Sequence, residues 1–326
     1  MTNFVKLVLD NGGVIKPLII PADHTNGTGL CNPSVFVDDG KILVNVRHIQ
    51  YTLYHSELQK YEHQYGPLVY LNPENDITLT TTNFICELNE DLNIINWSKV
   101  DTSGFDKQPL WEFVGLEDAR LVKWDDKYYL TGVRRDLDTI GTGRMELSEI
   151  EFTENSVREI SRFRIPSPPP DTEYCSKNWM PILDMPFHYV KWTNGTEIVK
   201  VTPEENKTEQ VVVKNWVHAT KDLRGGSQVI PYKDGYLTIN HETDLYKSEA
   251  GRKDATYRHR FTYWDKDWNI KKFSKVFSFL EAKIEFVCGM AKYHDDYLIT
   301  FGFQDNAAYI LKVPGKFMED FIDEQT

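Results

Sequence analysis

The sequence predicts an all-β fold, a five-bladed β-propeller, because one hairpin pattern recurs five times. Each copy has a polar or small entry, an apolar stretch, a tight turn, a second apolar stretch and a polar exit. The copies can be anchored on Leu43, Leu130, Tyr189, Leu237 and Leu298. A strand-rich unit repeated in this way is typical of solenoids and propellers. A β-sandwich with coincidental repeats is the competing interpretation, but five copies with polar exits favour the propeller.

The apolar stretches are predicted to be β-strands that pair as hairpins. They are rich in Val, Ile, Tyr and Leu and show no long run of helical spacing. The expected turns contain Asp, in some copies beside Gly or Pro, and lie at 38–40, 125–126, 184–186, 233–235 and 295–296. Asp and Gly tolerate the positive φ angles of tight hairpins, so each copy is predicted to form one hairpin.

A second hairpin is predicted after most copies. Segments 86–97, 197–213 and 261–273 each have the pattern of strand, polar turn and strand. Two hairpins make a four-stranded blade, and five blades closed in a ring remove most exposed sheet edges. The chain is therefore predicted to be one propeller domain over 1–326. Segment 51–73, rich in Tyr, His and Gln, is expected to form an insertion or lid over one face.

The overall charge argues against polyanionic partners. The chain has 49 Asp and Glu against 37 Lys and Arg, a formal net charge of −12. Nucleic acid and anionic membranes repel such a protein, so neither is an expected partner. One basic cluster, at 252–253 and 258–260, is interpreted as a solvated loop, and a nucleic-acid acceptor stays a disfavoured alternative.

Cysteine spacing and hydropathy narrow the class further. The four cysteines form no CxxC pair, which argues against zinc and dithiol redox chemistry. Neither a signal-peptide pattern nor an apolar run long enough to cross a bilayer is visible, so a cytoplasmic location is predicted. No cofactor is predicted, although a divalent ion that bridges donor phosphates stays compatible with the sequence.

The candidate site lies where the ends of the first hairpins would converge at one mouth of the propeller. These positions are Asn32, Arg47, Glu117, Asp118, Arg134, Lys177, Asn178, Arg224, His241, Glu242 and Asp305. Clustered cations in an acidic protein indicate an anionic ligand such as phosphate or a nucleotide diphosphate. Carboxylates beside them suit glycosyl chemistry, which needs a proton donor or acceptor. The alternative is that these charges pair with one another and join the blades.

Five short motifs in the same order resemble glycoside hydrolase family 130, the β-mannoside phosphorylases and hydrolases. They are Asn32-Pro33 with Arg47, the segment GLEDAR at 115–120, Lys177-Asn178, GGS at 225–227 with His241, and GFQD at 302–305. Ala119 stands where that family has proline, Asn178 where it has aspartate, and Asn-His-Glu at 240–242 where it has Tyr-His-Gly. With these departures, the chain is more similar to a divergent branch of the family, whose members tend to accompany glycosyltransferases.

The resemblance, which bears on Asp118, Arg134, Lys177 and His241, and the repeat positions together predict a role for each candidate residue. Asp118, with Glu117 beside it, would be catalytic and assist proton transfer. The predicted phosphate or nucleotide ligands are Arg47, Arg134, Lys177, Arg224 and His241, and the predicted sugar ligands are Asn32, Asn178, Glu242 and Asp305.

Three functions follow, in order of preference. The first is a glycosyltransferase that moves a sugar from a phosphate-activated donor, such as a nucleotide sugar, to an acceptor hydroxyl on a glycan. The second is a family 130-like phosphorylase or hydrolase of β-mannosides, and the third is a sugar-binding propeller without catalysis.

Overall fold

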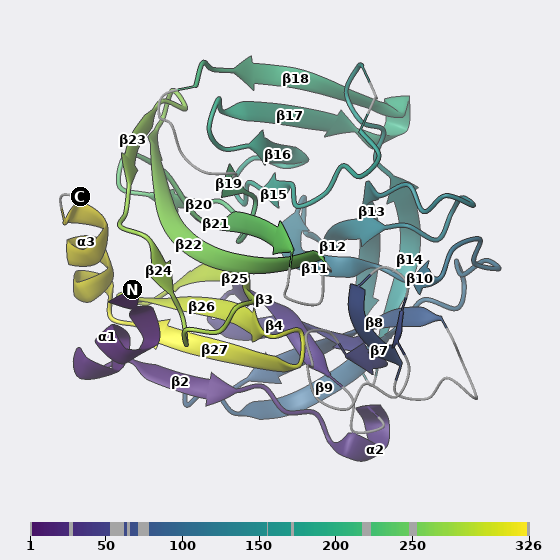
Figure 1. Ribbon diagram of the computed structural model, residues 1–326, viewed down its shortest axis with the longest axis horizontal. Coiled ribbons are helices and arrows are strands. Elements are labelled where there is room, and N and C mark those ends of the chain that lie inside the picture. The colour runs from purple at the N-terminus through teal and green to yellow at the C-terminus, as the bar shows by residue number, and fades with distance from the viewer. Residues whose placement is uncertain are drawn as a thin grey trace.

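The chain folds as a five-bladed β-propeller, as the sequence predicts, with the sheets arranged around one axis (Figure 1). The structure is a computed structural model that describes residues 2–25, 29–52, 62–63, 66–70, 78–154, 156–170, 173–216, 223–247 and 253–324. Among these residues, no helix combines the length and the apolar character that a bilayer crossing requires.

Blades 1 and 2 each contain four antiparallel strands. Blade 1 runs outwards from the axis as β3 (Leu30–Asp38), β4 (Lys41–Ile49), β8 (Leu79–Leu88) and β9 (Ile94–Asp101). Blade 2 runs as β11 (Glu117–Trp124), β12 (Lys127–Arg134), β13 (Arg144–Phe152) and β14 (Val157–Arg164). The outer strands β9 and β14 pair in parallel, and the short β10 (Phe113–Val114) pairs with β8. The second hairpin of blade 2 was not among the sequence predictions.

Blades 3 and 4 follow the same plan. Blade 3 consists of β15 (Met180–Pro181), β16 (His188–Trp192), β17 (Glu197–Thr202) and β18 (Lys207–Val213), with the 3-10 helix η1 (Pro203–Glu205) in its outer turn. Blade 4 consists of β20 (Ile230–Tyr232), β21 (Gly235–Lys247), β22 (Lys253–Asp265) and β23 (Ile270–Phe273). The two-residue strands β19 (Leu223–Arg224), β24 (Phe277–Ser278) and β1 (Thr2–Asn3) extend the sheet of blade 4.

The N-terminal segment closes the ring. Blade 5 contains β25 (Glu285–Tyr293), β26 (Asp296–Phe303) and β27 (Ala307–Val313), and its outer strand is β2 (Val14–Pro17). Helices α1 (Phe4–Asp10) and α3 (Gly315–Asp323) lie together beside blades 4 and 5 (Figure 1), with Phe4 and Phe321 in edge contact at 4.9 Å. A third helix, α2 (Ala22–Thr25), follows β2. The first and last parts of the chain thus hold the same seam of the ring.

The predicted hairpin turns are confirmed. Asp39, Asp125, Asp126 and Lys233 have φ angles of 47°, 50°, 61° and 51°, the conformation that tight turns require. The predicted second hairpins are also confirmed, as β8–β9, β17–β18 and β22–β23.

The structure also bears on the predictions for the basic cluster and for segment 51–73. The prediction of a loop for the basic cluster is wrong for residues 253 and 258–260, which belong to β22, a strand that pairs along its full length with β21. Backbone pairing with the long strand β21 therefore determines the structure of this segment, although its side chains are charged. Residue 252 lies outside the described residues. Segment 51–73 includes β5 (Tyr51–Thr52), β6 (Glu62–His63) and β7 (Gly66–Tyr70), which form a small sheet of their own. The rest of that expected insertion lies outside the described residues.

The hydrophobic core consists of seams between neighbouring blades. Between blades 1 and 5, for example, Val35 and Phe84 belong to one buried cluster with Leu298 and Ile310. Four further clusters occupy the other junctions around the ring. Because each sheet buries apolar side chains on both faces, the hydrophobic effect stabilises the ring as a whole rather than single blades.

A single glutamine connects several blades in the interior of the ring. The fully buried Gln228 donates from Nε2 to Ser34 Oγ and Val35 O, both at 2.9 Å, and to Leu121 O at 3.1 Å. Its Oε1 accepts from the amide of Met290 at 3.0 Å. One side chain therefore connects blades 1, 2, 4 and 5.

Candidate active site

Three residues in the left-handed backbone conformation mark the places where inner strands begin at the mouth. Asn32 in β3 has a φ of 44°, Asp118 in β11 has 50°, and Asn178, before β15, has 61°. Asn and Asp adopt this conformation more readily than other residues with side chains. β-Bulges interrupt β3 and β11 at the first two positions, and bulges re-aim side chains at the rims of closed folds. The sequence thus turns equivalent side chains of three blades towards one region.

Asp118 is the centre of a buried hydrogen-bond cluster. Its Oδ1 accepts from Asn32 Nδ2 at 2.7 Å and from Arg47 Nη1 at 2.8 Å. Its backbone oxygen accepts from Arg120 Nη1 at 2.7 Å. Burial alone would raise the pKa of Asp118, but Arg47, Lys177 and the Asn32 amide together hold that pKa below its usual value. Asp118 is therefore a carboxylate at neutral pH.

Arg47 connects this cluster to its neighbours and is only 5% exposed. Its Nη2 donates to Tyr51 Oη at 2.8 Å, to Thr81 Oγ1 at 3.0 Å and to Glu117 Oε2 at 3.3 Å. The adjacent Glu117 and Asp118 thus contact the same guanidinium, because the bulge between Glu117 and Arg120 interrupts the alternation of side chains along β11. Within the described part of the chain, the buried Glu117 Oε1 has no hydrogen-bond partner.

A second carboxyl group, Asp305, reaches the same place from blade 5. It follows β26, and its Oδ1 accepts from Asn32 Nδ2 at 3.3 Å. Burial raises the pKa of Asp305 to about 6; repulsion from Asp118 adds to the rise and Arg47 opposes it. One amide thus bridges two carboxyl groups whose pKa values move in opposite directions.

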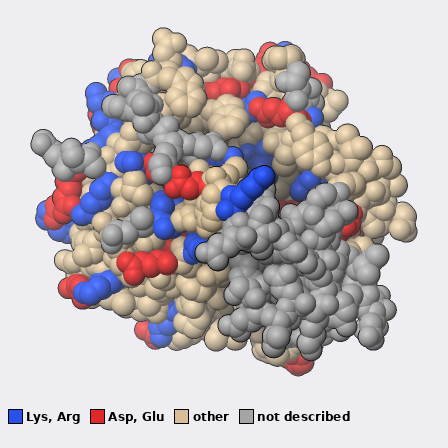
Figure 2. All heavy atoms as spheres, viewed as in Figure 1, with Lys and Arg blue, Asp and Glu red and all other residues tan. Residues whose placement is uncertain are grey.

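Lys177 and Arg224 supply positive charge on the other side of the mouth. The Lys177 side chain lies in a recess but stays open to solvent. Burial works against its charge, yet Cys175, Glu117 and other nearby groups raise the pKa of Lys177 above its usual value. No described residue forms an ion pair with it. Figure 2 shows a hollow near the middle of this face with Lys and Arg atoms around it.

His241 is close to these cations but does not carry a charge itself. Its ring is 1% exposed, and its Nδ1 donates to Gly225 O at 2.8 Å, which leaves Nε2 as an acceptor. Burial, reinforced by Arg224 and other cations, lowers the pKa of His241 to about 3. The imidazole can therefore accept a hydrogen bond at the mouth but does not attract an anion by charge.

Asn178 is brought to the mouth, whereas two predicted ligands are not. Asn178 is 8% exposed, and its Oδ1 is buried and has no partner among the described residues. Arg134 is buried in blade 2, where Nε donates to Glu146 at 2.6 Å and Nη1 to Asp136 at 3.3 Å. Glu242 follows His241 on β21, so it points to the opposite face, where it pairs with Arg260.

Sequence reasoning gave no role to Arg120 and did not find Tyr257. Arg120 lies inside the motif that contains Asp118, and it also donates from Nε and Nη2 to Gly226 O at 3.0 and 2.7 Å. Tyr257 contacts the His241 ring at 4.9 Å from the long hairpin β21–β22. The motif at 115–120 indicates Arg120 in part, whereas no sequence pattern around Tyr257 indicates that it lies at the site.

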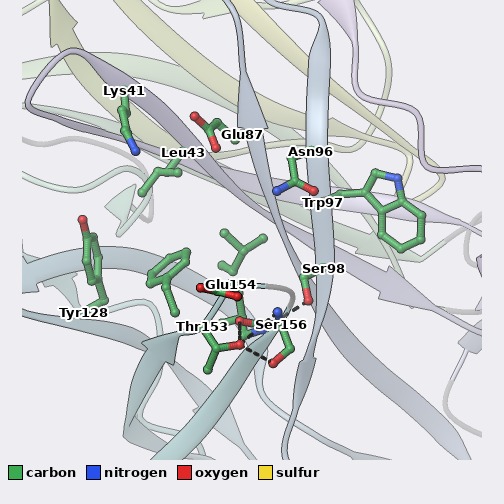
Figure 3. A pocket seen from close by; sticks show the side chains of 13 residues that line it. Lys41, Leu43, Glu87, Asn96, Trp97, Ser98, Tyr128, Thr153, Glu154 and Ser156 are labelled. Carbon is green, nitrogen blue, oxygen red and sulfur yellow. Dashed lines mark hydrogen bonds between the residues drawn. The ribbon is translucent and has the colours of Figure 1, made fainter.

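Two cavities lie between blades 1 and 2, the smaller of them beside the candidate site. One, of about 370 Å³, is lined by apolar side chains such as Leu43 and Phe152 with polar groups around them (Figure 3). The other, of about 220 Å³, is lined by Thr81 and Arg134 among others. The candidate site is thus defined by converging polar groups rather than by cavity size. Among the described residues, no group of His, Cys, Asp and Glu is arranged to hold a metal ion.

Comparisons with known proteins agree on the fold. No protein-family model matches the chain, and no curated sequence matches it significantly. Among solved structures, the chain is similar to β-1,2-mannobiose phosphorylase from Listeria innocua in complex with β-1,2-mannobiose (TM-score 0.56, 13% identity, 95% of this chain and 96% of that chain). It is also similar to a mannose phosphorylase from Leishmania mexicana in complex with phosphate (TM-score 0.54, 12% identity, 97% of this chain and 93% of that chain). A third similar structure is a glycosyl hydrolase from Bacteroides ovatus (TM-score 0.55, 11% identity, 89% of this chain and 85% of that chain). At these identities, the likeness establishes a shared five-bladed propeller fold.

Proposed function

We propose that this protein is a glycoside phosphorylase that cleaves a β-mannoside and transfers the mannosyl group to inorganic phosphate. One observation carries the proposal: a solvent-accessible Lys177 without an ion-pair partner among the described residues faces the same mouth as Asp118 and Asp305. An uncompensated cation beside carboxyl groups suits an anionic co-substrate that attacks a sugar.

The neighbouring groups fit the parts that this reaction needs. Lys177 and Arg224 would attract the phosphate. Asn32, Glu117 and Asn178 each have a buried oxygen without a hydrogen-bond partner in the described part of the chain, and these oxygens would accept hydrogen bonds from sugar hydroxyls. A buried polar atom without a partner is rare unless a ligand or water satisfies it. Asp118 and Asp305 are the two carboxyl groups available for proton transfer to the leaving oxygen.

The names of the similar structures support this choice among the functions that the sequence predicts. Two of the three are phosphorylases of mannosides or mannose, which matches the second prediction. The first prediction, a transferase that uses a nucleotide sugar, receives no such support. A β-mannoside and phosphate are therefore the substrates to test first.

The test is to incubate the purified protein with β-1,2-mannobiose and related β-mannosides, with and without phosphate. We expect a sugar 1-phosphate, detected by phosphorus NMR, only when phosphate is present. Release of free sugar at the same rate without phosphate would replace the proposal with hydrolysis. Turnover of GDP- or UDP-sugars in the absence of any glycoside cleavage would restore the transferase prediction.

Two variants link the activity to this site. Asp118→Asn should abolish the activity, since it removes the carboxylate at the centre of the cluster. Asp295→Asn is the matched control, because Asp295 is exposed in the turn at the other end of β26. If both variants kept the wild-type rate, the reaction would take place elsewhere.

A further inference from the structure

We propose that the larger cavity between blades 1 and 2 is a second, non-catalytic site that binds one neutral sugar unit. The cavity has a volume of about 370 Å³, and cavities of this size are typical of small-molecule sites in proteins. The proposal goes beyond the proposed function, because it assigns binding to a place that touches no reacting atom. Its basis is the position of the cavity and the hydrogen-bonding capacity of the side chains that face it.

The cavity lies at the end of blades 1 and 2 that is opposite the mouth. Lys41 begins β4 and lines the cavity, whereas Arg47 lies six residues further along the same strand. At roughly 3.3 Å per residue, the two positions are about 20 Å apart. In blade 2, Tyr128 near the start of β12 lines the cavity, and Arg134 ends that strand. A sugar bound in the cavity is therefore out of reach of the candidate active site.

One face of blade 1 supplies most of the lining. Alternate residues of three neighbouring strands face the cavity: Lys41 and Leu43 on β4, Ile85 and Glu87 on β8, and Asn96 and Ser98 on β9. The register pairs Glu87 with both Leu43 and Asn96. The ring of the intervening Trp97 contacts His24 at 4.4 Å and points away from the cavity (Figure 3). Strand alternation thus gathers polar and apolar side chains on one surface.

Three of these side chains have unused hydrogen-bonding groups. Lys41, Glu87 and Asn96 form neither a hydrogen bond nor an ion pair with any described residue, and they lie along one side of the cavity (Figure 3). An ammonium group only donates, a carboxylate only accepts, and an amide does both. Sugar hydroxyls both donate and accept, so they can pair with all three. An anion fits less well, because Glu154 also lines the cavity and two carboxylates face one ammonium.

The cavity also has an aromatic surface for the C–H face of a sugar ring. Phe152 is 37% exposed, and its ring contacts Tyr128 in an edge arrangement at 4.8 Å. Tyr128 is held in place because its hydroxyl donates to Asp38. A half-exposed ring beside unused polar groups suits a ligand that is apolar on its face and polar at its edge. A pyranose has this distribution of groups.

Hydrogen bonds hold the wall that blade 2 contributes. The amide of Ser156 donates to Thr153 Oγ1 at 3.1 Å, and the amide of Thr153 donates to Ser156 O at 2.9 Å. The amide of Val157 donates to Ser98 Oγ at 3.2 Å, which connects this wall to blade 1. The lining is therefore in place before a ligand binds, and a preorganised site loses less conformational entropy on binding.

Methyl NMR of protein labelled at Leu and Ile tests the proposal, because Leu43 and Ile85 report on the cavity directly. The probes are mannose, glucose, galactose, β-1,2-mannobiose, cellobiose and maltose. We expect at least one of them to shift both methyl signals in a saturable way, and Asp118→Asn should keep this shift, since Asp118 lies at the other end of the blades. The proposal would be overturned if none of these sugars shifted the signals, or if only phosphate or a free amino acid did so.

Two variants and a matched control connect the shift to the proposed contacts. Phe152→Ala should weaken the affinity for the sugar about tenfold and Asn96→Ala about fivefold, the losses expected for one ring contact and one hydrogen bond. Ile160→Ala is the control, because Ile160 is 40% exposed on β14 of the same blade and does not line the cavity. Thermal melting verifies that each variant is folded. Unchanged affinity in both Phe152→Ala and Asn96→Ala would contradict the assignment.

Kinetics show which glycan provides the sugar unit. If the unit belongs to the glycan that is being cleaved, Phe152→Ala should lower kcat/KM for a long β-mannan and leave the value for a disaccharide unchanged. If it belongs to a separate glycan, both values should stay unchanged. If the wild type cleaved no glycoside, the proposed function would fail, and the NMR titration would still decide whether the cavity binds sugar.

Discussion

A buried cluster of arginine and carboxylate in blade 2 contrasts with the one at the mouth, and the contrast separates a structural network from a candidate site. In blade 2, Arg134 contacts Glu146 and Asp136, and Arg162 contacts Glu146, Glu159 and Asp106. At the mouth, Arg47 contacts Glu117 and Asp118, but Asp305 and Lys177 have no ion-pair partner among the described residues. The residue types are the same in both places. What differs is whether opposite charges find partners within the protein.

This difference shows which charges are available to a ligand. Every arginine of the blade 2 cluster is engaged by carboxylates, so the cluster connects β12, β13 and β14 and has little capacity left for an anion. Among the described residues, the mouth retains an exposed ammonium, a carboxyl group without an ion-pair partner and buried oxygens without hydrogen-bond donors. Opposite charges that remain apart in a recess cost free energy unless something else binds there. The four variants below test this contrast, from the largest expected effect to the smallest.

Arg47→Met should have the largest effect on activity. Without the guanidinium, the pKa of Asp118 should rise, so the acid limb of the pH profile of kcat/KM should move to higher pH. We expect a loss of about 10²–10³-fold in kcat/KM, comparable to the removal of one strong charge-stabilising donor. Arg47→Lys should recover part of this loss, because it restores the charge without the two-pronged geometry. An unshifted acid limb in Arg47→Met would show that Arg47 does not control Asp118.

Arg134→Met should affect stability and leave phosphate binding unchanged. Removal of Arg134 leaves Glu146, which is fully buried, with one cation fewer, and breaking a buried pair in this way costs about 3 kcal/mol of unfolding free energy. Burial already raises the pKa of Glu146, and the variant should raise it further. A carboxyl group whose pKa is higher in the folded state destabilises that state when it is ionised, so the loss should shrink as pH falls.

Chemical denaturation at several pH values measures this loss. Arg158→Met is the matched control, since Arg158 forms an exposed ion pair with Glu151 in the same blade and should change stability little. An increase in the KM for phosphate in Arg134→Met, without a loss of stability, would return Arg134 to the phosphate site that the sequence predicts.

Lys177→Met should show the reverse pattern. Its side chain is exposed and has no ion-pair partner among the described residues, so its loss should leave the melting temperature nearly unchanged. The KM for phosphate should rise about tenfold, the effect of losing one charge-assisted contact of about 1.4 kcal/mol. The KM for the glycoside should change much less. A large fall in melting temperature would place Lys177 with the structural network instead.

The fold could be predicted because its signal is repeated along the chain. The turns at Asp39, Asp125 and Lys233 each identify a hairpin locally, and five hairpins together predict the ring. The closing strand β2 could not be found in this way, since Val14–Pro17 belongs to no repeat and its partner β27 is almost 300 residues away in sequence. Long-range pairing of a short strand leaves no local pattern.

The candidate site could be predicted only in part, for a related reason. Repeat position predicted that Asn32 and Asp118 lie close together, and the two are hydrogen-bonded because a bulge and a left-handed residue occur at the equivalent place in both blades. It could not show that Arg134 turns to Glu146, because the direction of a side chain at a strand end depends on contacts between strands. The protonation states of Asp305 and His241 depend on burial and on charges from other blades, which a sequence does not display.

His241→Gln should have the smallest effect of the four variants. A glutamine amide can replace the hydrogen bond to Gly225 O, and a neutral imidazole contributes no charge to phosphate binding. We therefore expect the KM for phosphate to change less than about threefold, against about tenfold for Lys177→Met, since only a charged donor makes the stronger contact. In the wild type, the ring carbon signals of His241 should not titrate between pH 5 and 8, because burial keeps its pKa near 3. The assignment of a neutral imidazole would be wrong if His241 titrated in that range and if its replacement weakened phosphate binding as much as Lys177→Met does. His241 would then be a further cation of the mouth, in spite of its burial and of the cations beside it.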